Sequence, residues 1–133
     1  MADQLEVAVV SADRALWSGK AKSVSAKTPE GDVGIWRGHE PMLALLMEAP
    51  LRIELEDGSK VLVAVHGGFF SVDSDKVNVI AETAELAQDV DLERAQAALA
   101  RLKANPDSED LSALRRAETR IQVASVVKGV NTR

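Results

Sequence analysis

The sequence predicts an α+β fold in which an N-terminal antiparallel β-sandwich is followed by a C-terminal antiparallel two-helix hairpin. Up to Ala81 the apolar residues alternate along the chain, which is typical of half-buried strands. Beyond Ala84 they recur at every third or fourth position, which is typical of amphipathic helices. Seven of the 8 glycines precede this change, where strands need turns. We therefore expect a β-sandwich domain over residues 1–84 and a helical hairpin domain over residues 85–133.

Short alternating runs separated by turn signals define the strands of the first domain. The Asp57-Gly58 step lies between two such runs and is a strong hairpin signal, because both positions tolerate positive φ. Ser74-Asp75 marks a second turn. Strands this short favour a sandwich or barrel over βαβ units. The predicted strands are Leu5–Val10, Lys22–Lys27, Leu51–Glu56, Lys60–His66, Phe69–Val72 and Lys76–Ala81.

Two helices are predicted in the second domain. Asp91 is a suitable N-cap for the first helix, which should run to about Lys103 and end before Asn105-Pro106. Asp107 or Ser108 can cap the second helix. Its apolar stripe consists of Leu114, Ala117, Ile121 and Ala124. Because the stripes are rich in alanine, the contact buries little area, and we expect the hairpin to open at a cost of a few kcal/mol.

Composition excludes several classes of protein. The net charge of −5 argues against a nucleic-acid-binding protein, and the absence of cysteine excludes disulfides and thiolate metal sites. No apolar run approaches the ~20 residues that span a bilayer, and no signal peptide is recognised, so we expect a soluble, cytosolic protein. The charge is uneven, because residues 1–110 carry 11 Lys/Arg against 20 Asp/Glu, whereas residues 111–133 carry 5 against 1. This basic segment is either a solvated helix face or an arm that meets an anionic partner.

The two histidines do not indicate a catalytic or metal site. His39 lies in the run Gly31–Pro41, which we interpret as a loop interrupted by glycines. Trp36 would either anchor this loop by packing or expose it for contact. A small hydrolase that uses His39 as base and Glu40 as orienting carboxylate is a remote alternative. His66 is interpreted as a strand-end residue, and neither histidine has a metal-binding partner at suitable spacing.

The arginines of the helical half suggest an anion site. Arg94 and Arg101 are seven residues apart and share one face of the first helix, while Arg116 and Arg120 are four apart and share one face of the second. If the hairpin closes, the four guanidinium groups converge, and guanidinium forks match phosphate oxygens. The alternative is a set of solvated arginines with local ion pairs.

Three motifs resemble those of one known family, the epsilon subunit of the F-type proton-translocating ATP synthase. The run from Glu30 to Ile35, followed by Gly38-His39-Glu40-Pro41, is similar to the most characteristic loop of that family. His66–Val72 resembles its second signature, and Val79–Glu82 leading to Asp91–Ala95 resembles the third. The motifs occur in the right order over nearly the whole chain.

The resemblance implies a non-catalytic rotor subunit. The sandwich would bind the gamma subunit and rest on the ring of membrane c subunits, so the chain would be peripheral to the cytoplasmic face of a bacterial cell membrane. The residues that would contact the ring or gamma are Asp32, Trp36, Arg37, His39 and Met42. Arg37 departs from the family pattern, which commonly has proline before Gly-His.

The resemblance also implies a regulatory hairpin. Folded on the sandwich, the hairpin would permit ATP hydrolysis, and extended along gamma it would enter the alpha/beta catalytic head and inhibit. No cofactor is required, but some family members bind regulatory ATP in the folded hairpin. The matching residues here are Glu85, Asp91, Arg94, Arg101, Arg116 and Arg120. The main alternative to this interpretation is a free-standing β-sandwich adaptor whose hairpin docks on an unrelated protein.

Overall fold

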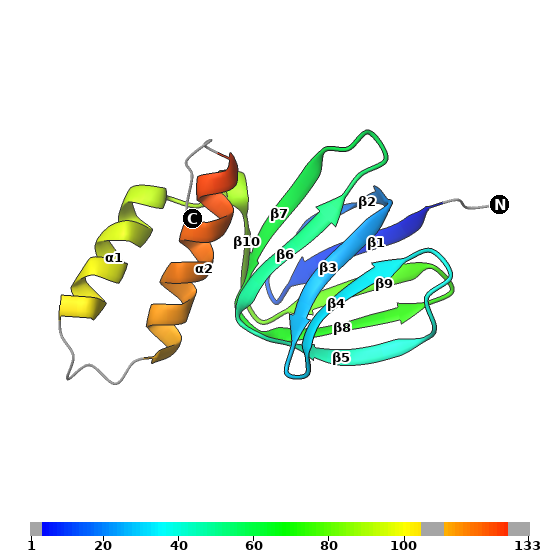
Figure 1. The fold of residues 1–133 in the computed structure, drawn as a ribbon, viewed down its shortest axis with the longest axis horizontal. Helices are drawn as coiled ribbons and strands as arrows, with labels where there is room; N and C mark the ends of the chain where they lie inside the picture. The colour runs from blue at the N-terminus through cyan, green and yellow to red at the C-terminus, as the bar shows by residue number, and fades with distance from the viewer. Residues whose placement is uncertain (1–3, 105–110, 128–133) are drawn as a thin grey trace.

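The computed structural model describes residues 4–104 and 111–127 and contains two five-stranded sheets followed by two α-helices (Figure 1). Sheet A has the spatial order β2 (Ala15–Ala21), β1 (Leu5–Ser11), β9 (Lys76–Ala81), β8 (Gly68–Asp73) and β5 (Met42–Leu46). Sheet B has the order β10 (Ala84–Leu86), β7 (Lys60–Val65), β6 (Ala49–Glu54), β3 (Ser23–Thr28) and β4 (Gly31–Trp36). After a short 3-10 helix, η1 (Ala87–Asp89), come α1 (Leu92–Ala104) and α2 (Leu111–Val127). The predicted α+β class is therefore confirmed.

The inner faces of the two sheets form the main hydrophobic core. Alternate residues of the strands point into it, as the strictly alternating burial of β9 shows. Phe70 is its largest fully buried side chain, with Leu5 from the same sheet and Ile35, Leu51 and others from the facing one. Opposing inner faces of this kind are how a sandwich removes apolar surface from water.

One pair of strands departs from the antiparallel pattern. β1 and β9 are parallel, with Val7 opposite Val77 and Val9 opposite Val79. The chain between them passes through both sheets before it returns, so no tight turn constrains their relative direction. The other strand pairs are antiparallel, including β6 with β7 and β8 with β9 across the two predicted turns.

Strands β2, β4, β5 and β10 lie outside the predicted set. The interpretation of Gly31–Pro41 as a loop was wrong for its first half, because Gly31–Trp36 forms β4, an edge strand paired with β3. Gly31 and Gly34 interrupt its apolar pattern, so the sequence does not signal this strand. Gly34 has a packing role there, since a Cβ at this position would lie 2.5 Å from a ring atom of Trp36. The boundary predicted at residue 84 falls at the start of β10, which pairs with β7.

The helical hairpin is folded against the sandwich, with α2 between α1 and sheet B (Figure 1). Strand β7 is buried on both faces, because Val63 and Val65 face the main core while Leu62 and Ala64 contact the helical segment. Val123 and Ala124 of α2 are buried in this second, smaller cluster.

The helix ends were predicted in part. Asp91 is the N-cap of α1, because its Oδ1 accepts a hydrogen bond from the Arg94 backbone N–H at 3.1 Å. The predicted caps of the second helix, Asp107 and Ser108, lie outside the described residues. Among the described helices, none is long and apolar enough to cross a membrane.

One buried side chain of α2 carries a hydroxyl that has no described hydrogen-bond partner. Ser125 is fully buried, and its Oγ has no hydrogen-bond partner within residues 4–104 and 111–127. The buried face of α2 thus combines Ala117, Val123 and Ala124 with this hydroxyl.

Candidate functional site

A charged cleft of about 480 Å³ lies where the hairpin meets the sandwich. Its arginines come from both helices, Arg94 and Arg101 from α1 and Arg120 from α2. The remaining lining residues are Glu85, Asp89, Asp91, Ala95 and Ala98. The structure therefore brings together five of the six residues predicted for an ATP site. The sixth, Arg116, is half-buried one turn before Arg120 but does not line this cleft.

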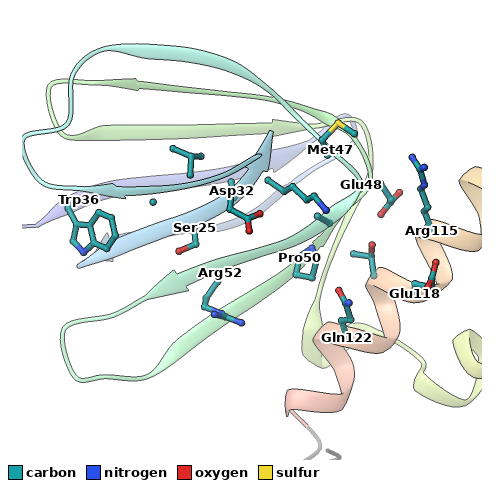
Figure 2. Close-up of a pocket in the computed structure, with 16 residues that line it drawn as sticks. Ser25, Asp32, Trp36, Met47, Glu48, Pro50, Arg52, Arg115, Glu118 and Gln122 are labelled. Carbon is teal, nitrogen blue, oxygen red and sulfur yellow. The ribbon is translucent and has the colours of Figure 1, made fainter. Parts of the chain in front are cut away.

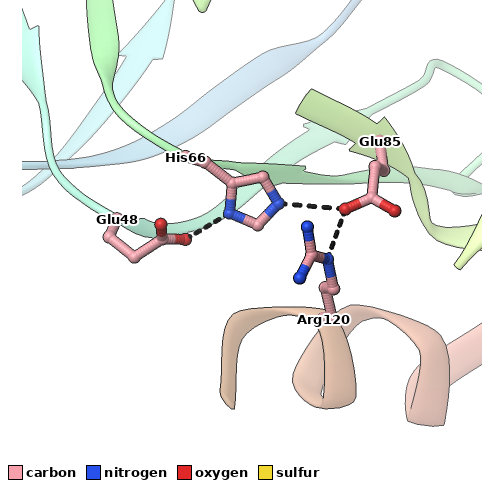
Figure 3. A network of polar contacts seen from close by, with 4 residues as sticks. All are labelled: Glu48, His66, Glu85 and Arg120. Carbon is pink, nitrogen blue, oxygen red and sulfur yellow. Dashed lines mark hydrogen bonds and ion pairs between the residues drawn. The ribbon is translucent and has the colours of Figure 1, made fainter. Parts of the chain in front are cut away.

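A chain of four charged or ionisable side chains crosses the joint between sandwich and hairpin (Figure 3). His66 Nδ1 lies 2.7 Å from Glu48 Oε2, and His66 Nε2 lies 3.0 Å from Glu85 Oε1. The same Glu85 oxygen accepts a hydrogen bond from Arg120 Nε at 2.5 Å. Glu48 and His66 belong to sandwich connections and Glu85 to β10, so Arg120 is the only member that the hairpin contributes.

The geometry of this network favours a protonated His66. Each ring nitrogen of His66 faces a carboxylate oxygen, and only the imidazolium can donate from both nitrogens. Burial alone would lower the pKa of His66, but its hydrogen bonds to Glu48 and Glu85 outweigh that effect and raise the pKa above its ordinary value of 6.5. The hydrogen bond from His66, followed by that from Arg120, lowers the pKa of Glu85 to about 2 against the effect of desolvation.

The sequence analysis predicted no role for Glu48 and did not predict the polar contacts of His66. His66 was interpreted as a strand-end residue, but its side chain is only 2% exposed and is bonded on both sides. The one local signal was an acidic residue, Glu48, next to an apolar run. The partners lie 18 and 19 residues from His66 in sequence, so only the strand pairing brings them together.

A second hollow, a groove of about 830 Å³, runs between the outer face of sheet B and α2 (Figure 2). Trp36, Asp32 and Arg52 lie on its sheet side, and Arg115, Glu118 and Gln122 on its helix side. Both hollows carry charges of both signs, but the cations of the first, which we call the arginine cleft, are all arginines, whereas those of the groove are Lys27, Arg52 and Arg115. Trp36 is 55% exposed at the far end of β4.

The residues predicted to contact a ring or gamma are placed by β4, β5 and the loop between them, which we call the contact loop (residues 37–41). Asp32 and Trp36 are exposed on β4, and Arg37 is exposed in the contact loop. His39 is half-buried, and its Nδ1 donates to the backbone carbonyl oxygen of Glu40 at 2.7 Å. The expected role of the Glu40 carboxylate in a hydrolase is therefore not supported. Met42, at the start of β5, packs partly against the main core.

An apolar patch on the outer face of sheet A was not predicted. Leu43 and Leu45 of β5 are 72% and 64% exposed. Phe69 of β8 pairs with Leu45 on one side and with Ile80 of β9 on the other, and both are 40% exposed. We call these four residues the sheet A patch. The run Met42–Leu46 is apolar on both faces, which signals either a fully buried strand or a contact surface.

Within the described part of the chain, no group of three or more His, Cys, Asp or Glu residues is arranged to hold a metal ion.

A family model described as the ATP synthase delta/epsilon chain β-sandwich domain matches residues 4–87. The ATP synthase epsilon chain of Streptomyces griseus is 44% identical over 126 residues, which cover 95% of this chain and 99% of that relative. The chain belongs to the ATP synthase epsilon chain family. The epsilon chain of Rhodococcus jostii is also 44% identical, over 90% of this chain and 94% of its own length.

Solved structures support the epsilon-chain fold. A chain of the mitochondrial ATP synthase of Euglena gracilis superposes with a TM-score of 0.72 at 23% identity, covering 97% of this chain and 82% of that one. A chain from the Tetrahymena thermophila mitochondrial ATP synthase has a TM-score of 0.53 at 17% identity, covering 96% of both chains. At these identities the likeness concerns the fold. The resemblance stated from sequence motifs is confirmed, and an epsilon chain is a non-catalytic subunit, so the small-hydrolase alternative is wrong.

The charged network predicts a specific pH dependence of stability. Because the pKa of His66 is raised by folding, its contribution is fully present below its ordinary pKa of 6.5 and is lost as pH rises through the raised value. His66→Gln should therefore lower the free energy of unfolding by about 1–3 kcal/mol at pH 5.5, and by less at pH 8.5. Urea unfolding at both pH values checks this, with His39→Gln as the control. Equal losses at the two pH values would contradict it.

Proposed function

We propose that this epsilon chain is a central-stalk rotor subunit of ATP synthase, peripheral to the cytoplasmic face of a bacterial cell membrane. It couples rotation of the c ring to the catalytic head, and its hairpin regulates ATP hydrolysis. The observation that carries the proposal is the near-complete match to curated epsilon chains, at 44% identity over 95% of the chain. The similar folds belong to ATP synthase assemblies described with a c-ring or a central stalk, which supports the same placement.

The two outer regions of the sandwich suit two partners. The contact loop and the adjoining end of β4 present Trp36, Arg37 and His39, while Asp32 lies near the other end of β4, and we assign these residues to the c ring. The sheet A patch is apolar and lies on strands rather than loops, so it suits a larger, complementary protein surface. We assign it to gamma, with Met42 at the boundary between the two contacts.

The hairpin is proposed to be a movable arm. In the docked arrangement α2 contacts β6, β7 and η1, whereas α1 contacts mainly α2, so release of α2 frees the whole hairpin. The buried cluster that holds it is small and includes the alanines Ala64, Ala87 and Ala124. The arginines of α2, namely Arg115, Arg116 and Arg120, give the extended arm a basic surface for the alpha/beta head.

The cleft is proposed to bind regulatory ATP, which would hold the arm closed. Three guanidinium groups face a hollow that both helices and β10 enclose, which provides donors for phosphate oxygens. Glu85 already accepts from Arg120, so a phosphate that binds Arg120 competes with this carboxylate. Asp91 caps α1 through the backbone N–H of Arg94. Ala95 and Ala98 form the apolar wall.

The assignment to gamma predicts that the sheet A patch is needed for assembly. Leu43→Ser with Leu45→Ser should weaken capture of gamma by more than about tenfold, because exposed apolar anchors dominate interface energies. Both side chains are largely exposed, so folding should be unaffected. Titration of purified gamma checks this, with Leu111→Ser, an exposed leucine on the arm, as the matched control. Unchanged capture would contradict the assignment.

The regulatory role predicts a gain of hydrolysis on truncation. A chain that ends at residue 87 keeps β10, which completes sheet B, but lacks the rest of η1 and the arm. We expect ATP hydrolysis by the assembled enzyme to rise, while gamma capture by the truncated chain stays intact. The comparison is made with the full-length chain at equal occupancy of the complex. Equal hydrolysis by the two complexes would contradict an inhibitory arm.

The ATP assignment predicts loss of nucleotide-dependent stabilisation. A ligand at about 100 times its dissociation constant stabilises the folded state by about 2.7 kcal/mol. Arg94→Ala should abolish the thermal shift that ATP produces, and Arg120→Ala should do the same while also breaking the Glu85 contact. Arg52→Ala, in the other groove, is the control. Arg116→Ala tests the one predicted residue that does not line the cleft. Equal ATP-dependent thermal shifts in wild type and Arg94→Ala would refute the site.

A further inference from the structure

A carboxylate ties the contact loop to a distant part of the chain. The backbone N–H of Gly38 donates to Asp75 Oδ1 at 2.7 Å, across 37 residues of sequence. Gly38 has a φ of +86°, in the region that favours glycine, and a Cβ built there would meet nothing within 4 Å. Glycine is therefore favoured here because of the positive φ, not because a side chain would lack space. In this backbone conformation the N–H of Gly38 points at Asp75.

Asp75 is itself held firmly. It lies with Ser74 in the turn between β8 and β9, where both residues have positive φ, 63° and 52°. This is the backbone of a tight two-residue hairpin, whose twist matches that of the flanking strands. The carbonyl oxygen of Asp75 also accepts from the Glu6 N–H at 2.9 Å, at the start of β1. The side chain therefore projects from a point where three strands of sheet A are joined.

The contact loop has its own local structure. The His39 N–H donates to the Trp36 carbonyl oxygen at 3.2 Å, which closes a turn around Arg37 and Gly38. The loop carries the chain from β4 in sheet B to β5 in sheet A, so its internal turn does not by itself fix its position against either sheet. The Asp75 carboxylate links this turn to sheet A.

We propose that Asp75 is a positioning residue for the c-ring contact, holding Gly38 so that Trp36, Arg37 and His39 are presented in their binding arrangement before the ring is met. The inference rests on the proposed function, which assigns this loop to the ring. Its physical basis is preorganisation, since a loop that is already ordered loses less conformational freedom on binding. A carboxylate that accepts from a backbone N–H is among the stronger hydrogen bonds of a protein surface.

The test uses substitutions that the left-handed backbone of this turn tolerates. Asp75→Gly removes the carboxylate without adding strain, and Asp75→Asn keeps an acceptor oxygen at nearly the same place. Ser74→Gly loosens the same turn but leaves the Gly38 contact, so it is the matched control. Each variant is prepared as the full-length chain in complex with gamma, and its affinity for purified c ring in detergent is measured. Hydrogen exchange of the Gly38 amide is measured by NMR on the full-length chain.

Asp75→Gly should speed exchange at Gly38 and weaken ring binding by about tenfold, while Asp75→Asn and Ser74→Gly should stay close to wild type. Unchanged exchange in Asp75→Gly would overturn the proposed contact. Faster exchange with unchanged ring binding would overturn the positioning role, provided that Trp36→Ala and His39→Ala weaken binding. If these two substitutions also leave ring binding unchanged, the assignment of the loop to the ring fails, and the proposal fails with it.

Discussion

The carboxylate of Glu85 is shared by two cationic side chains that belong to different bodies of the molecule. His66 reaches it from the sandwich and Arg120 from the hairpin, and both use the same oxygen (Figure 3). Apolar contact between the bodies is limited to a small cluster around Leu62, Ala64 and α2. The orientation of the arm, and with it the existence of the arginine cleft, therefore depends on this carboxylate together with that cluster.

This arrangement connects protonation, arm position and ligand binding. Glu85 remains ionised throughout the physiological range because its pKa is about 2. Arg120 is thus already neutralised when the cleft is empty, which avoids an uncompensated cluster of positive charge beside Arg94 and Arg101. A polyanion that binds Arg120 in the cleft displaces Glu85 from an existing ion pair, so it does not meet three uncompensated guanidinium groups. This competition reduces the affinity of the cleft for an anion, which is compatible with the regulatory ATP site proposed above.

The sequence predicted those parts of the fold that are encoded locally. Strands with alternating residues, such as β9, and the hairpins at Asp57-Gly58 and Ser74-Asp75 were identified because their signals lie within a few residues. Edge strands were missed, since β2 is largely exposed and β4 contains two glycines. The parallel pairing of β1 with β9 depends on the whole intervening chain and has no local signal. In the same way, helical spacing predicted that Arg94 and Arg101 share a face, but it did not predict that Arg116 lies outside the cleft or that Glu48 and His66 meet.

The buried hydroxyl of Ser125 affects the stability of the docked arm. A polar group removed from water without a partner costs roughly 1–3 kcal/mol, and the Ser125 hydroxyl of docked α2 has no partner among the described residues. On release, water satisfies the hydroxyl at once. The docked state is therefore less favoured than its close packing implies. If the hairpin is the movable arm proposed above, this one oxygen atom in α2 shifts the equilibrium toward the released state.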